Sequence, residues 1–140
     1  MVHALELAAG MLAPGGQVAD IRALDERAEF LVPPPGGGPP RSCGFLRETD
    51  EGIEYRQAEA ALKEALARGV LTLVSEQPFT FRHHASSLPA MRAYLADTWT
   101  DAIIDPDVAA AIEAALAAAG PGAELVLRES GWMRVLTAGS

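Results

Sequence analysis

The chain has 140 residues and a net charge of −8, and 49% of its residues are hydrophobic. This length suits a single domain, 1–140, that buries a sizeable core. The 11 basic residues are scattered singly, whereas nucleic-acid binding needs clustered cations that neutralise phosphates. The composition therefore argues against nucleic acid and anionic membranes as partners. A single cysteine, Cys43, excludes an internal disulfide framework.

The sequence also predicts a cytoplasmic location. The chain opens without the basic region of a signal peptide. It also lacks the run of about 20 apolar residues that a membrane span needs.

The first predicted elements are a helix, a tight turn and a strand. Apolar residues recur with helical spacing from position 5 to position 12, which predicts a helix over 2–13. The sequence Pro14-Gly15-Gly16 ends it, because proline cannot continue a helix and glycine accepts positive φ. A strand over 17–22 follows. Residues 33–40 are all proline or glycine and predict a loop, either a lid over a substrate or a surface insertion.

A hairpin, a helix and an extended segment are predicted next. Residues 45–48 and 53–55 flank a turn at 50–52, which predicts a hairpin. The clearest helix is 57–68, where small apolar residues recur with helical spacing on one side and charged residues on the other. Residues 70–74 are apolar and β-branched, which favours an extended conformation.

The C-terminal half alternates between strands and helices. Pro78 is expected to break the extended segment before a strand over 79–83. Helices are expected to begin after Ser87, a serine cap, and after Asp105, an aspartate cap followed by proline. The end of the chain predicts two strands, 124–128 and 132–136, or one strand with a bulge at Gly131.

No reactive side chain stands in a pattern that predicts chemistry by this chain alone. His83 and His84 are neighbours on a predicted strand, so they point to opposite faces and cannot chelate one metal ion. Ser86 lacks the sharp turn of a nucleophilic serine. Cys43 is interpreted as a small apolar filler, although nearby arginines would lower the pKa of its thiol. Glycines 36–38 lack the Lys-Ser/Thr of a phosphate loop, so the sequence predicts no metal site and identifies no catalytic residue.

The N-terminal region resembles part of a known enzyme family. The sequence Met1-Val2-His3, a short helix and then Leu12-Ala13-Pro14-Gly15-Gly16 before a strand are similar to class I S-adenosylmethionine-dependent methyltransferases. In that family a histidine-containing turn after the fourth strand leads into a helix that ends in Leu-x-Pro-Gly-Gly, and the fifth strand follows. The rest of the chain resembles the C-terminal part of the small-molecule branch of these enzymes.

The resemblance implies an α/β fold with a partial, Rossmann-like mixed sheet of three to five strands and about four helices. The family's sheet order is 3-2-1-4-5-7-6, so this chain corresponds to the C-terminal half, with strands in the order 5-7-6. The family's cofactor-binding residues lie on the half that is not represented here. The resemblance therefore implies no cofactor bound by this chain alone, and S-adenosylmethionine only where a complementary half is supplied.

A free strand edge is a further expectation. Without a neighbour resembling the fourth strand, the strand over 17–22 exposes an edge, and apolar edges promote association. We expect this edge to pair with a second copy, as a homo-oligomer, or with a complementary cofactor-binding chain.

Substrate contacts are predicted at the end of the same strand. Asp20 and Arg22 lie at its C-terminal end, where ligands of open α/β sheets usually sit. Together with Tyr55 and the 33–40 loop, they are the candidates for substrate binding. Three interpretations stay open: the substrate side of a methyltransferase that is inactive alone, a non-catalytic binding or oligomerisation module derived from that fold, and a truncated reading frame of a longer methyltransferase.

Overall fold

The computed structural model describes residues 2–139, which fall into two compact units. The first unit comprises residues 2–25, 52–79 and 130–139, and the second comprises 26–51 and 80–129. Two strands, β5 (Leu71–Ala85) and β7 (Leu125–Ala138), contribute one part to each unit. The single domain expected from the chain length stays a prediction.

The expected α/β class is confirmed. The described residues form four helices and a mostly antiparallel sheet of five strands, which lies within the predicted range. A separate two-stranded sheet pairs β4 (Arg47–Glu48) with β6 (Ala102–Ile103).

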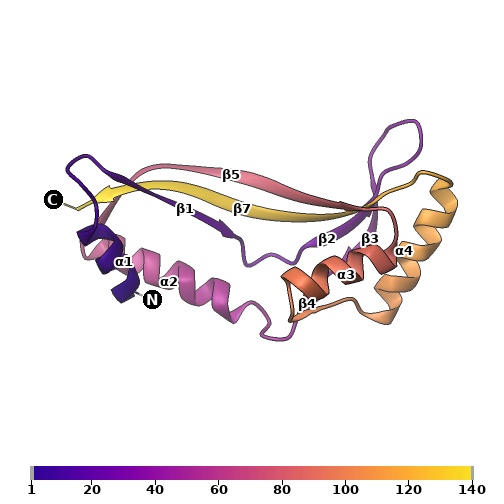
Figure 1. Ribbon diagram of the computed structural model, residues 1–140, viewed down its shortest axis with the longest axis horizontal. Coiled ribbons are helices and arrows are strands. Elements are labelled where there is room, and N and C mark those ends of the chain that lie inside the picture. The colour runs from indigo at the N-terminus through magenta and orange to yellow at the C-terminus, as the bar shows by residue number, and fades with distance from the viewer. Residues whose placement is uncertain (1, 140) are drawn as a thin grey trace. The chain divides into compact units, whose positions relative to one another are not determined.

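In the first unit β7 is the middle strand of three. β1 (Gln17–Ala23) pairs antiparallel with it, and Val18 stands opposite Leu136. Because β1 occupies one edge of this part of β7, β5 lies along the other edge (Figure 1). The Gly139 N–H donates a hydrogen bond of 3.0 Å to the Val70 carbonyl where β5 begins and β7 ends. The strand order is β1-β7-β5, and no strand among residues 2–139 pairs with the outer edge of β1.

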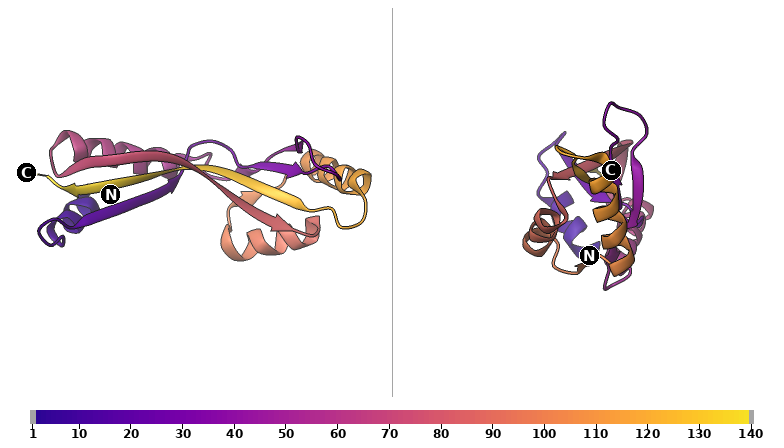
Figure 2. Two further views of the ribbon diagram at one scale, coloured as in Figure 1. Left: turned by 90° about the horizontal axis from the view of Figure 1, so that it is seen from above. Right: turned by 90° about the vertical axis from the view of Figure 1, so that its right-hand side faces the viewer.

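Both helices of this unit, α1 (Val2–Gly10) and α2 (Ile53–Ala67), lie on the same face of these strands (Figures 1 and 2). A small core of leucines from α2, β5 and β7 fills the space beneath them, namely Leu62, Leu71 and Leu136. On β1 every second residue faces this side, and the intervening Ile21 is 59% exposed on the other. The predicted helix over 2–13 and the strand over 17–22 are therefore present, with the helix ending three residues early, at Gly10.

The second unit is built around a hairpin. β2 (Glu29–Val32) and β3 (Arg41–Phe45) pair antiparallel on either side of the 33–40 loop, whose prediction as a loop is confirmed. β2 also pairs with the start of β7. Helices α3 (Leu88–Thr98) and α4 (Pro106–Ala119) pack with the hairpin on a second core of mostly apolar side chains.

The predicted hairpin between 45–48 and 53–55 is wrong. Residues 47–48 pair with β6, and Ile53 begins α2, which starts four residues before the predicted helix. Gly52 precedes α2 with φ +79, and a Cβ there would collide with the Asp25 carboxylate. Only glycine accepts this conformation without strain, so the turn directs the chain into a helix although the next residues favour strands.

Two predicted interruptions of strands are absent. β5 runs without a break through Pro78, because it pairs only with β7 among the described residues and an edge strand tolerates proline. β7 is one strand through Gly131, which keeps its regular partner Ala23 and forms no bulge there. Gly131 instead leaves room for the Phe79 ring, which lies where a side chain would stand.

The caps of the later helices differ from each other. Ser87 caps α3 as predicted, since its hydroxyl oxygen accepts a hydrogen bond of 3.2 Å from the Ala90 N–H. Asp105 precedes α4 but makes no side-chain cap. Its carboxylate instead accepts hydrogen bonds of 2.7 and 3.0 Å from Arg47, and these hold the pKa of Asp105 below its ordinary value. An aspartate before Pro106 thus connects α4 to β4.

We predict that Gly131→Ala destabilises the protein by about 1–3 kcal/mol, as overpacking of a filled site does. The new Cβ would stand 2.5 Å from Phe79 Cζ and 2.7 Å from the Arg22 carbonyl oxygen, which is backbone and cannot move aside cheaply. Equilibrium unfolding in urea measures the change.

The matched control is Gly10→Ala, where no atom beyond the neighbouring residues and the backbone of the same helix lies within 4 Å of the new Cβ. Gly10 is the last residue of α1, so alanine at this position is expected to be neutral or to stabilise the protein by up to about 1 kcal/mol. Equal losses in the two variants would contradict the role given to Gly131.

Candidate functional site

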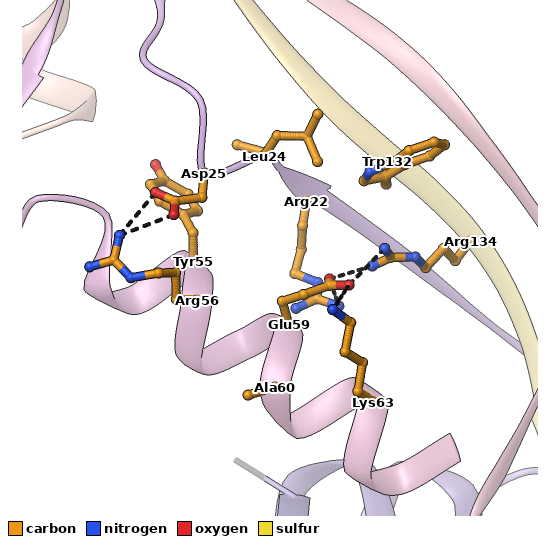
Figure 3. Close-up of a pocket in the computed structure, with 11 residues that line it drawn as sticks. Arg22, Leu24, Asp25, Tyr55, Arg56, Glu59, Ala60, Lys63, Trp132 and Arg134 are labelled. Atoms are coloured by element: carbon orange, nitrogen blue, oxygen red, sulfur yellow. Dashed lines mark hydrogen bonds and ion pairs between the residues drawn. The ribbon is translucent and has the colours of Figure 1, made fainter. Parts of the chain in front are cut away.

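The first unit contains a cavity of about 410 Å³ beside the C-terminal end of β1. Its walls come from β1 and the residues after it, from one side of α2, and from β7 (Figure 3). Two of the predicted substrate residues, Arg22 and Tyr55, both line it. The third, Asp20, is not part of the lining, but its carboxylate accepts a hydrogen bond from the Arg22 guanidinium.

Regular spacing brings the lining residues together. On α2, Tyr55, Glu59 and Lys63 follow each other at intervals of four, so they share one face of the helix. On the strands, alternate residues face this helix, and the register places Arg134 of β7 directly opposite Asp20 of β1. The cavity therefore has charged residues from three segments that are distant in sequence.

Arg134 is the centre of the charged cluster. Its side chain is only 7% exposed, and it donates two hydrogen bonds to Glu59, of 2.8 and 3.1 Å, and one of 2.5 Å to Glu76. Asp20 lies 3.6 Å from the same guanidinium. Burial alone would lower the pKa of Arg134, but the hydrogen bonds to Glu76 and Glu59 raise it above its ordinary value. Arg134 is therefore a fixed cation.

Arg22 is held beside this centre. One of its terminal nitrogens donates a hydrogen bond of 2.8 Å to Asp20 and lies 3.7 Å from Glu59. Its Nε is also 2.8 Å from Asp20 but lacks hydrogen-bond geometry, and no other described residue accepts its proton. The carboxylates thus fix the position of Arg22 at the wall of the cavity.

The two ends of the cavity differ. At one end Arg56 donates hydrogen bonds of 3.0 and 3.2 Å to Asp25, close to Tyr55 (Figure 3). At the other end Lys63 approaches Glu59 at 3.9 Å, and its side chain is 73% exposed. Glu59 already accepts two hydrogen bonds from Arg134. Lys63 is therefore held more loosely by Glu59 than Arg56 is held by Asp25.

Other reactive groups lie in the second unit. Burial raises the pKa of the Cys43 thiol, and Arg41 lowers it by less, so the expected activation by nearby arginines is reversed. Burial also raises the pKa of Glu129, with a smaller contribution from Glu48. Neither group lines the cavity of the first unit.

The histidines do not form a metal site. His83 stacks on Tyr94 with ring centroids 3.4 Å apart, whereas Nδ1 of His84 lies 3.1 Å from Glu124. Within residues 2–139 no group of three or more histidine, cysteine or carboxylate side chains is arranged to hold a metal ion.

The 33–40 loop, the remaining substrate candidate, lines a different cavity from Arg22 and Tyr55. Its prolines lie in the second unit and line a smaller cavity of about 170 Å³ against Ala115, Ala118 and Ala119 of α4. They are not among the residues that line the cavity with Arg22 and Tyr55.

Sequence reasoning did not identify Glu59, Lys63, Trp132 or Arg134. The spacing of four on α2 predicts only that its charged residues share one side of the helix, and it does not indicate that they line a cavity. A stronger signal was Arg134, a cation that alternates with Trp132 and Leu136 on the covered face of a predicted strand. A charge in such a position needs partners.

Comparison with protein-family models, with curated proteins and with solved structures found no match to this chain. None of the helices within 2–139 has the length and apolar character needed to cross a membrane.

We predict that Arg134→Gln destabilises the protein by about 3 kcal/mol, since removing one partner of a buried ion pair leaves the others uncompensated. Glu76 would then lose the guanidinium that it accepts from, while Asp20 and Glu59 would keep their weaker neutralisation by Arg22 and Lys63. Urea unfolding at neutral pH measures the loss.

The control is Arg68→Gln at the residue that caps the C-terminus of α2, where the half-exposed guanidinium contacts Glu6 and Glu64. Its expected cost is about 0–1 kcal/mol. A cost for Arg134→Gln no larger than this would show that the cluster does not stabilise the unit.

Proposed function

We propose that this chain forms the substrate-side half of a class I S-adenosylmethionine-dependent methyltransferase fold. In this proposal the methyl donor is held by a cofactor-binding half, on the same or another polypeptide, that pairs with β1. The observation that carries the proposal is the strand order β1-β7-β5, with β1 at the edge.

The strand order supports the proposal because it is the order that the resemblance implies for strands 5, 7 and 6. β1 follows the Leu-x-Pro-Gly-Gly sequence and would be strand 5, β5 would be strand 6, and β7 would be strand 7. β7 lies between the other two although it comes last in the chain, and it runs antiparallel to β1.

The outer edge of β1 supports the pairing. The Leu24 N–H donates a hydrogen bond of 2.8 Å to the Ser130 carbonyl, which is on the β7 side. Since backbone groups of alternate residues point to opposite sides of a strand, those of Ala19 and Ile21 point to the outer edge. No strand in the described part of the chain pairs with these groups, and a row of unpaired backbone groups on a seven-residue strand is a template for another strand.

The position of the cavity supports the assignment of this chain as the substrate-binding half. It lies beside the C-terminal end of β1, with Arg22 and Ala23 in its wall, and ligands of open α/β sheets bind beyond the carboxyl ends of strands. The position suits a methyl acceptor that must meet a donor bound on the neighbouring strands.

A non-catalytic oligomerisation module derived from the same fold is the second candidate. It is favoured by apolar side chains on the strands of the first unit that are open to solvent, Ile21 at 59% and Val74 at 54% exposure. Solvent-exposed apolar side chains beside an open strand edge suit a contact with a second copy.

We predict that the chain alone gives no saturable heat when titrated with S-adenosylmethionine up to about 1 mM, which corresponds to roughly −4 kcal/mol of binding free energy. If one polypeptide carries both halves, the chain extended upstream of Met1 is expected to bind it, because the cofactor-binding half would supply the glycine-rich turn. Binding by the chain alone would contradict the division into halves. Absence of binding in both would overturn the form of the proposal in which one polypeptide carries both halves.

We predict that the purified chain self-associates at micromolar concentration through β1, and that Ala19→Pro shifts it towards the monomer. Proline removes an N–H from the outer edge and leaves the hydrogen bonds to β7 intact. Ala19→Thr keeps the N–H and is the matched control. Size-exclusion chromatography with light scattering measures the mass, and a folded monomer of the unmodified chain would contradict the prediction.

A further inference from the structure

The cavity in the first unit differs in character from the rest of this acidic chain. Four cationic side chains line it, from Arg22, Arg56, Lys63 and Arg134, against two carboxylates, from Asp25 and Glu59. The protein as a whole carries a net charge of −8. The lining itself therefore has more cations than carboxylates, while Asp20 and Glu76, which contact Arg134 outside the lining, bring the whole cluster to four of each.

Both carboxylates in the wall are already satisfied. Glu59 accepts two hydrogen bonds from Arg134, and Asp25 accepts two from Arg56. A cationic ligand would have to compete with these guanidinium groups. The wall therefore favours an anion over an amine.

Lys63 is the cation best placed to receive that anion. Its ammonium lies 3.9 Å from Glu59, beyond hydrogen-bond distance, and its side chain is 73% exposed. In contrast, Arg134 is buried and already donates to Glu59 and Glu76. One loosely held ammonium suits a single negative charge better than a phosphate dianion, which usually needs several donors.

The remaining wall is mainly aromatic and aliphatic, and the Arg134 guanidinium lies over the Trp132 ring, 5.9 Å from its centroid. The chain has only two tryptophans and two tyrosines, and one of each, Trp132 and Tyr55, lines this cavity. Leu24 and Ala60 add aliphatic surface (Figure 3). Aromatic walls favour a ring, because stacked or edge-to-face rings gain energy beyond the area they bury. A volume of about 410 Å³ lies at the lower end of ordinary ligand pockets.

We infer that the cavity binds a small planar carboxylate, an aromatic or heterocyclic carboxylic acid in its ionised form. The carboxylate lies against Lys63, and the ring packs on Trp132 and Tyr55. The inference rests on the proposed function only in treating this ligand as the methyl acceptor. The binding itself needs neither the methyl donor nor a partner.

Titration of the ¹⁵N-labelled full chain with benzoate tests the inference. The tryptophan side chains give two indole N–H signals, and Trp99→Phe identifies the signal of Trp99, which lies in the second unit. Benzoate is expected to shift the Trp132 signal saturably, with a Kd below about 1 mM. Benzamide has the same shape without the charge and is expected to bind at least about tenfold more weakly.

Variants of Lys63 distinguish benzoate bound at this cavity from a nonspecific effect of benzoate on the protein surface. Lys63→Gln is expected to weaken benzoate binding about tenfold, and Lys63→Arg to restore it to within about threefold. Both substitutions are at an exposed position that leaves the core unchanged. Arg68→Gln, at the C-terminal cap of the same helix and outside the cavity, is the control and is expected to leave benzoate binding unchanged.

Four outcomes would overturn the inference: no saturable shift up to about 10 mM benzoate, equal binding of benzamide, binding of inorganic phosphate as tight as that of benzoate, or an unchanged Kd in Lys63→Gln. This titration contains no S-adenosylmethionine. Its failure therefore leaves the strand-order proposal standing, and failure of the methyl-donor titration leaves the ligand site standing.

Discussion

The structure depends on β7 more than on any other element. Within residues 2–139, β1, β2 and β5 all pair with this strand, and only β3 of the main sheet does not. Its two parts meet different demands. The part in the second unit begins with Leu125, Val126 and Leu127, all buried, and suits an apolar core. The part in the first unit carries Arg134 at a covered position and therefore requires carboxylates around it.

That requirement determines the architecture of the cavity. Glu59 and Glu76 reach Arg134 from α2 and β5, and Asp20 reaches it from β1, so one guanidinium connects three elements of the unit. Replacing a buried ion pair by apolar residues of similar volume often leaves the stability of a protein unchanged or raises it. Stability alone therefore does not explain the cluster. A rigid polar wall that fixes Arg22 and leaves Lys63 only loosely paired with Glu59 would explain it, in the ligand site proposed above.

Local signals in the sequence predicted β1, α3 and α4, because alternation, a serine cap and an Asp-Pro start each act within a few residues. The β2–β3 hairpin was missed, since its strands are separated by eight prolines and glycines and their pairing is set by the core beneath them. The start of α2 was assigned to a strand because Ile53 and Tyr55 favour one, and the positive φ of Gly52 overrides that preference. In the site, Arg22 and Tyr55 could be proposed from position alone, whereas the ion cluster depends on a register that no single segment encodes.

β1 is the element on which the two proposed contacts meet. Its covered side chains, Asp20 and Arg22, belong to the cluster behind the cavity, and its outward backbone groups form the free edge. A strand added at that edge would restrain the backbone that carries both side chains. Because Arg22 is already fixed by Asp20 and Glu59 rather than by the edge, we expect the acceptor site to be formed before any partner strand arrives. The partner would then contribute the donor and the closing wall, which is the division of roles that a substrate-side half requires.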